Sequence, residues 1–219
     1  MSPWVALHNV QALLHIAKEV EFHADVAIHA ANRVISSSEW SVDWGSLYAL
    51  GTHAGCAGAF LETSPSRGKT LTSAFPGRAE ALSALTAIDE DLTGIKQIRD
   101  AMIHADERLE AEWLRLEGLG ESRERIQMRA VGPLPADGRA LINWDPASRQ
   151  LSARAAAGKA ITLAVEYNSV DVVELRDRLR NVEFGASRLA DYIRTMSEGT
   201  PGVRSLPPRA TKTVSTDPR

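Results

Sequence analysis

The sequence predicts a mainly α-helical protein, a four-helix up-and-down bundle with a small antiparallel β insertion between its third and fourth helices. Three observations lead to this prediction. Apolar residues recur at steps of three and four over long stretches, which is the period of a helix with one buried face. From about residue 126 to residue 167 the pattern changes to short alternating or β-branched runs, which favours strands. Clusters of serine, proline and glycine separate these segments.

The first two helices are expected to follow directly on one another. Ser2 and Pro3 form a good helix start, because serine can cap a helix and proline is tolerated at its first position. This helix should run to about Ile35, where three serines stop it. The second should begin near Ser41 or Asp43 and reach about Glu62. Its glycines are spaced for close packing against another helix, and they are Gly51, Gly55 and Gly58.

The third helix is expected to be the longest. Pro76 can open it, after a loop over residues 63–75, and the apolar pattern continues to about Glu117. Gly118 and Gly120 end it, since glycine readily adopts the left-handed conformation that terminates helices.

The β insertion is predicted over about residues 126–167. Its expected strands, two to four of which form the sheet, are Ile126–Val131, Ala140–Trp144, Gln150–Ala155 and Ile161–Glu166. Asp145 and Pro146 open a turn between two of these strands. The fourth helix should be capped by Ser169 and end near Met196. The bundle domain therefore covers residues 1–196, and the polar stretch 197–219 is expected to be a disordered tail.

Composition excludes several classes of protein. The 219-residue chain is 44% hydrophobic, which suffices for a real core, and its formal net charge of −3 gives no overall basic field. Binding to nucleic acid would therefore need a local cluster of cations. One cysteine allows no internal disulfide. No signal-like start and no apolar stretch of membrane-spanning length is seen, so we expect a cytoplasmic protein with no membrane partner.

A helical wheel of the third helix places charges inside its apolar stripe. With about 100° per residue, Arg99 lies within roughly 60° of the apolar residues of that helix. These are Leu85, Ile88, Leu92, Ile95, Met102 and Trp113. Asp106 falls in the same stripe. Because buried unpaired charge is costly, these two residues need each other, a partner helix or a cleft.

A neighbouring stripe of the same helix carries Asp100 and His104, four residues apart. At this spacing the carboxylate can orient the imidazole. Arg99, Asp100 and His104 thus provide a cation, an acid and a titrating base within about one and a half turns. Metal-free RNA cleavage needs a proton acceptor for the 2′-hydroxyl and a cation for the charge that develops on the phosphate. We therefore assign Arg99, Asp100 and His104 as candidate catalytic residues.

The stretch Ile98-Arg99-Asp100-Ala101-Met102-Ile103-His104 resembles the motif of HEPN domains, which is an arginine, a polar residue, a few further residues and then histidine. Ala105 to Leu109 extends a pattern that resembles uncharacterised bacterial relatives of that group. The resemblance implies a helical homodimer whose two motifs face each other across a shared cleft. It also implies a metal-independent endoribonuclease in which Arg99 binds phosphate, His104 moves the proton and Asp100 positions them.

Two other functions remain open from the residues alone. In the first, the chain is a non-enzymatic interaction or regulatory bundle, in which Arg99 and Asp106 are structural and His104 is incidental. In the second, a small molecule or a metal binds the first helix through its histidines and Glu19. The first-helix histidines are His8, His15, His23 and His29. The sequence contains neither a His-Glu-x-x-His motif nor a cysteine cluster, so we assign no cofactor and no metal.

Overall fold

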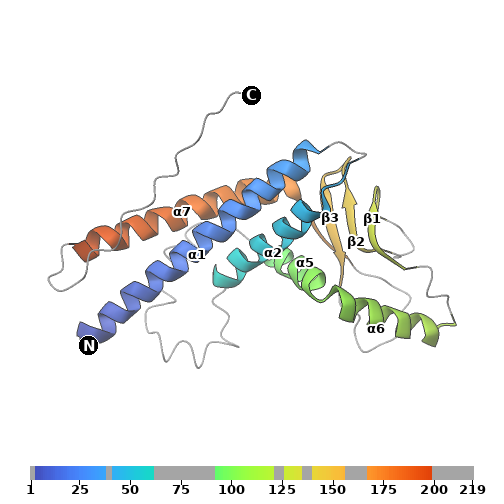
Figure 1. Cartoon of the computed structure of the whole chain (residues 1–219), viewed down its shortest axis with the longest axis horizontal. Coiled ribbons are helices and arrows are strands. Elements are labelled where there is room, and N and C mark those ends of the chain that lie inside the picture. Colours follow the sequence, from blue (N-terminus) through green and yellow to red (C-terminus); the bar gives the residue numbers. More distant parts are fainter. Residues whose placement is uncertain are drawn as a thin grey trace.

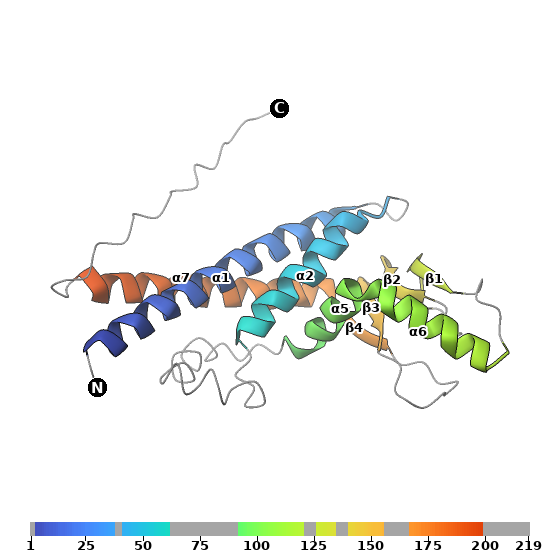
Figure 2. The ribbon, with the colours of Figure 1, turned by 60° about the horizontal axis from the view of Figure 1, so that its bottom comes forward.

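The computed structural model describes residues 3–37, 41–61, 92–120, 126–134, 140–155 and 167–198. The described part of the chain is mostly helical and also contains a four-stranded sheet. The expected helical protein is therefore confirmed, but the fold is not a pure four-helix bundle. In Figures 1 and 2, two long helices lie side by side and the sheet sits near one end of them.

The two long helices are α1 (Pro3–Ser36) and α7 (Val172–Glu198), and α2 (Trp44–Leu61) packs on the other side of α1. The expected start and end of the first helix are confirmed, and so is the second helix. Small residues on the buried face of α1 allow the close approach of its neighbours, and they are Ala17, Ala24, Ala27 and Ala31. The last three share a core with the larger Leu47, Leu50, Leu179 and Val182, whereas Ala17 packs in a smaller cluster with Leu14, Ala190 and Ile193.

The expected third helix is bent rather than straight. The described part consists of α5 (Thr93–Ile103) and α6 (Ala105–Gly118), which meet at His104, and residues 76–91 lie outside the described residues. His104 leaves helical geometry with φ −104° and ψ 33°. The backbone hydrogen bonds from His104 to Asp100 and from Arg108 to His104 are nevertheless kept. α5 packs on α2 and also contacts the sheet, and α6 continues past the bend along the same sheet (Figure 1).

The bend also corrects the placement of Asp106 inside the apolar stripe. Asp106 is exposed, because the helical wheel assumed one straight helix with a single buried face. In α6 the buried positions are Glu112 and Leu116 instead.

The sheet is mixed, whereas an antiparallel one was expected. Its strands are β1 (Gln127–Val131), β2 (Ala140–Asp145), β3 (Gln150–Arg154) and β4 (Tyr167–Asp171), in that spatial order. β1 pairs with β2 in parallel, and the other two pairs are antiparallel. Alternating patterns identify strands but carry no information on their direction. The expected strand at 161–166 lies outside the described residues.

Two local predictions around the sheet have different outcomes. The turn between β2 and β3 is confirmed, and the Asp145 carboxylate accepts hydrogen bonds from the Ala147 backbone and the Ser148 hydroxyl. The predicted cap of the last helix is wrong, because Ser169 belongs to β4 and Asp171 caps α7 instead. Oδ1 of Asp171 accepts the backbone N–H groups of Val173 and Glu174 at 2.8 and 2.9 Å. Residues 199–219 of the predicted tail lie outside the described residues.

The glycines of α2 allow α5 to pack closely, as their spacing indicates. A Cβ atom at Gly55 would lie 2.5 Å from Cβ and 2.7 Å from Cδ of Arg99, and one at Gly51 would lie 2.4 Å from the sulfur of Met102. A Cβ atom at Gly94, in the first turn of α5, would meet nothing within 4 Å.

We expect Gly55→Ala to lower the free energy of unfolding by about 1–3 kcal/mol, because the added methyl group overlaps the stem of Arg99 and forces the helices apart. The matched control Gly94→Ala should raise it by up to about 1 kcal/mol, since alanine favours a helix and the site is open. Urea denaturation measures both changes. Equal effects of the two substitutions would contradict the close packing of α2 and α5.

Candidate functional site

The structure joins two of the three predicted site residues. Nε and Nη2 of Arg99 donate hydrogen bonds to Oδ1 of Asp100 at 3.0 and 2.6 Å, and Nη1 donates to the carbonyl oxygen of Gly55 at 3.3 Å. The side chain of Arg99 is 17% exposed and that of Asp100 is 40% exposed. Arg99 is therefore held between its sequence neighbour and the backbone of α2.

His104 has a different set of neighbours. Its side chain is 53% exposed, and Nδ1 lies 3.4 Å from Oε2 of Glu107 in the first turn of α6. Asp100, predicted to orient this ring, pairs with Arg99 instead. Glu107 follows His104 by three residues and therefore shares its face of the helix. The structure thus assembles Arg99 with Asp100, and it places His104 with residues that follow it.

A pocket of about 330 Å³ lies between α6 and the sheet, and His104 is one of its lining residues. One side is formed by His104 and four residues of α6, which are Glu107, Arg108, Ala111 and Glu112. The sheet side is formed by Leu141 of β2, Arg154 of β3 and the adjacent Ala155. We call this the α6–sheet pocket. Its lining combines the imidazole of His104 with arginine side chains and apolar side chains.

Arg108 is the residue of this pocket that sequence analysis missed. It is partly buried, and its Nη1 donates a hydrogen bond to the carbonyl oxygen of Arg154. Burial lowers the pKa of Arg108, while the negative charge of Asp100 acts in the opposite direction. The available signal was its spacing, since Arg108 follows His104 by four residues and so shares its face of the helix.

A buried ion network anchors α6 to the sheet beside the pocket. Oε2 of Glu112, whose side chain is 4% exposed, lies 2.8 Å from Nε of Arg115 and 2.8 Å from Nη2 of Arg154. Burial lowers the pKa of Arg154, and the carboxylate of Glu112 opposes that shift. The sequence contains no indication of this network. Glu112 and Arg115 follow the ordinary polar pattern of a helix, and Arg154 lies at the end of a strand.

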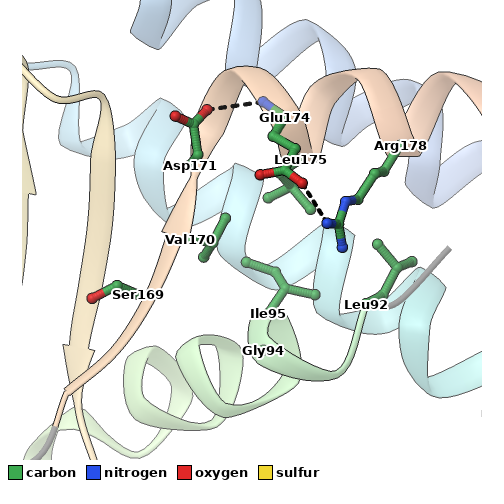
Figure 3. A pocket seen from close by; sticks show the side chains of 9 residues that line it. All are labelled: Leu92, Gly94, Ile95, Ser169, Val170, Asp171, Glu174, Leu175 and Arg178. Carbon is green, nitrogen blue, oxygen red and sulfur yellow. Dashed lines mark hydrogen bonds and ion pairs between the residues drawn. The ribbon is translucent and has the colours of Figure 1, made fainter.

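A second pocket, of about 200 Å³, lies where α5, β4 and the start of α7 meet (Figure 3). Its apolar lining comes from Leu92, Ile95, Val170 and Leu175. Its charged groups already serve the local structure, because Asp171 caps α7 and Glu174 forms an ion pair with Arg178. These interactions give the charged groups of the second pocket a structural role, and its lining contains no histidine.

Two of the first-helix histidines, His23 and His29, lie beside other polar side chains. Nε2 of His29 lies 3.4 Å from Oδ1 of Asp25. Nδ1 of His23 lies 2.9 Å from Nδ1 of His53 on α2, and the ring of Phe60 stacks on His23. Such a contact requires one imidazole to donate and the other to accept. Among the described residues, no group of three or more histidine, cysteine or acidic side chains is arranged to hold a metal ion.

Comparison with protein-family models, with curated proteins and with solved structures yields no match to this chain. Within the ranges that the structure describes, no helix has both the length and the apolar composition needed to cross a membrane. The candidate function therefore depends on the geometry of the residues themselves.

We expect Glu112→Gln to lower the free energy of unfolding by about 3–5 kcal/mol, because it removes the negative charge that compensates buried Arg154. Glu110→Gln, on the exposed side of the same helix, should change it by less than about 0.5 kcal/mol. Guanidinium denaturation of both variants measures the difference. A small effect at Glu112 would show that the buried network does not anchor α6.

The His23–His53 pair predicts a loss of stability in mild acid. Burial, followed by the charge of His23, lowers the pKa of His53 below its ordinary value of about 6.5. The unfolded chain therefore takes up this proton at a higher pH than the folded chain. The resulting stability is complete above about pH 6.5 and is lost as the pH falls below it.

This prediction is checked by denaturation at pH 7.5 and pH 5.5. The drop in the free energy of unfolding should be smaller in His53→Gln, which cannot titrate, than in the parent protein. His29→Gln is the matched control and should keep the parent's drop. An identical pH dependence in all three proteins would refute a role for His53.

Proposed function

We propose that this chain is a HEPN-like protein that cleaves RNA without a metal ion, with His104 as the residue that moves the proton. The observation that carries the proposal is the position of His104. It lies at the bend between α5 and α6, its side chain is half-exposed, and it shares a pocket with the partly buried cation Arg108. A base accessible to substrate and a cation beside it are what this reaction requires.

The reaction itself needs few groups from the protein. His104 accepts the proton of the ribose 2′-hydroxyl, and the resulting oxygen attacks the adjacent phosphorus. The bond from phosphorus to the 5′-oxygen then breaks, and that oxygen takes up a proton. The products are a 2′,3′-cyclic phosphate and a 5′-hydroxyl. An arginine beside the phosphate stabilises the negative charge of the transition state.

Arg99 and Asp100 are the further functional residues of this proposal. The resemblance assigns phosphate binding to Arg99, and Asp100 holds its guanidinium through two hydrogen bonds to Oδ1. A straight helix turns about 140° between Arg99 and His104. The proposal therefore includes a homodimer, in which the motif of a second copy brings its phosphate-binding arginine to the shared cleft.

A specific observation favours the second candidate function, a non-enzymatic interaction or regulatory bundle. The stem of Arg99 packs where a Cβ atom of Gly55 would stand, and Nη1 of Arg99 donates to the Gly55 carbonyl oxygen. These contacts give Arg99 a structural role that requires no substrate. Asp106, the other residue of that alternative, is exposed.

The experiment that tests the proposal is RNA cleavage in a chelating buffer by the full chain. His104→Ala should reduce the rate about 10²- to 10⁴-fold, which is typical for loss of a general acid or base. His29→Ala is the matched control, since His29 is 71% exposed on α1 and should leave the rate unchanged. The products should carry cyclic phosphate ends.

Arg99→Ala separates the two candidate functions. A loss of cleavage with an unchanged free energy of unfolding supports the catalytic assignment of Arg99. A loss of stability without any cleavage by the parent, over several RNA sequences, supports the interaction bundle and contradicts the ribonuclease.

A further inference from the structure

From the α6–sheet pocket we infer that the protein binds one nucleotide unit of its RNA there, with the phosphate at His104 and Arg108 and the base against Ala111, Leu141 and Ala155. This inference rests on the proposed function and adds to it the place where the substrate is held. The lining combines charged and polar side chains with the apolar side chains of Ala111, Leu141 and Ala155, and each kind matches one part of a nucleotide.

The side chains of His104 and Arg108 are suited to bind a phosphate. The hydrogen bond from Arg108 to the Arg154 carbonyl oxygen engages Nη1, and a guanidinium has further N–H donors in the same plane. Burial lowers the pKa of Arg108, so the surrounding protein compensates its charge incompletely. The phosphodiester of an RNA carries one negative charge and would provide that compensation through charge-assisted hydrogen bonds. Glu107, beside His104, is 74% exposed, and its charge is therefore screened by solvent.

The remaining charged groups of the pocket do not require a ligand. Glu112 pairs with Arg154 at 2.8 Å, and the same carboxylate oxygen contacts Arg115 at 2.8 Å. The adjoining walls are the side chains of Ala111, Leu141 and Ala155, which offer van der Waals contact. A flat, weakly hydrated base is the part of a nucleotide that gains most from leaving water for such walls.

The size of the pocket limits what it accepts. About 330 Å³ is near the lower end of the range for small-molecule sites, which is roughly 300–1,000 Å³. One nucleoside-sized group fits that volume, whereas a stacked run of bases needs an open groove. His104 lines the same pocket, so a phosphate bound by Arg108 would lie beside the imidazole that accepts the proton in the proposed cleavage.

The test is isothermal titration of the full chain with the four 5′-mononucleotides, with adenosine, and with inorganic phosphate. At least one mononucleotide should bind more tightly than inorganic phosphate. Arg108→Gln should weaken that binding about tenfold or more, since a charge-assisted hydrogen bond contributes roughly 1.5–3 kcal/mol. Its effect on adenosine, which lacks the phosphate, should be several-fold smaller.

The larger side chain of Ala111→Phe would occupy space in the pocket that the nucleobase needs. It should therefore abolish mononucleotide and adenosine binding. Ala111 is exposed on α6, so the substitution requires no repacking of the core. The matched control is Leu114→Phe, at a position 68% exposed on the same helix and outside the pocket lining. It should leave binding unchanged. Unaltered binding in Ala111→Phe, or no binding of any mononucleotide by the parent, would overturn the inference.

Failure of this inference is distinguishable from failure of the proposed function. Nucleotide binding that is lost in Ala111→Phe, without RNA cleavage by the parent, would retain the pocket and refute the ribonuclease. Cleavage by the parent that is fully retained in Ala111→Phe would support the ribonuclease and refute nucleotide binding in the pocket.

Discussion

One stretch of helix in this protein packs against both α2 and the sheet, and it bends at His104, where α5 ends and α6 begins. Before the bend, α5 lies close to α2 because Gly51, Gly55 and Gly58 leave room for Met102, Arg99 and Leu92. After it, α6 is fixed to the sheet by the ion network of Glu112. His104 lies between these two anchors, and its half-exposed side chain lines the α6–sheet pocket.

The sequence predicted the parts of the fold that depend on long apolar periodicity. The stripes of α1, α2 and α7 each extend over several turns, so their existence and most of their bounds could be read directly. It failed where a structure depends on contacts distant in the chain. A helical wheel assumes a straight axis, so it could not show that Asp106 faces solvent. Strand patterns carry no direction, so the parallel pairing of β1 with β2 was not foreseen.

In the candidate site, too, the sequence showed the spacing of the residues but not their contacts in space. The spacing of Arg99, Asp100 and His104 was evident, but their side-chain partners were not. Asp100 was expected to orient His104, and it pairs with Arg99 because the two side chains are adjacent and Gly55 of α2 holds the guanidinium nearby. Arg108 and Glu112 followed an ordinary polar pattern along α6. Only the position of the sheet distinguishes these two residues from the exposed charges around them.

The helix geometry also determines which arginine can act with His104 within one copy of the chain. Arg99 precedes His104 by five residues, which is roughly 140° around the helix, and its guanidinium is committed to Asp100 and to α2. Arg108 follows by four residues, about 40° around, and lines the same pocket as His104. A single copy therefore presents His104 with Arg108, whereas pairing His104 with Arg99 requires a second copy. The dimer of the proposed function thus follows from the placement of Arg99 and not from any need of His104 for a cation.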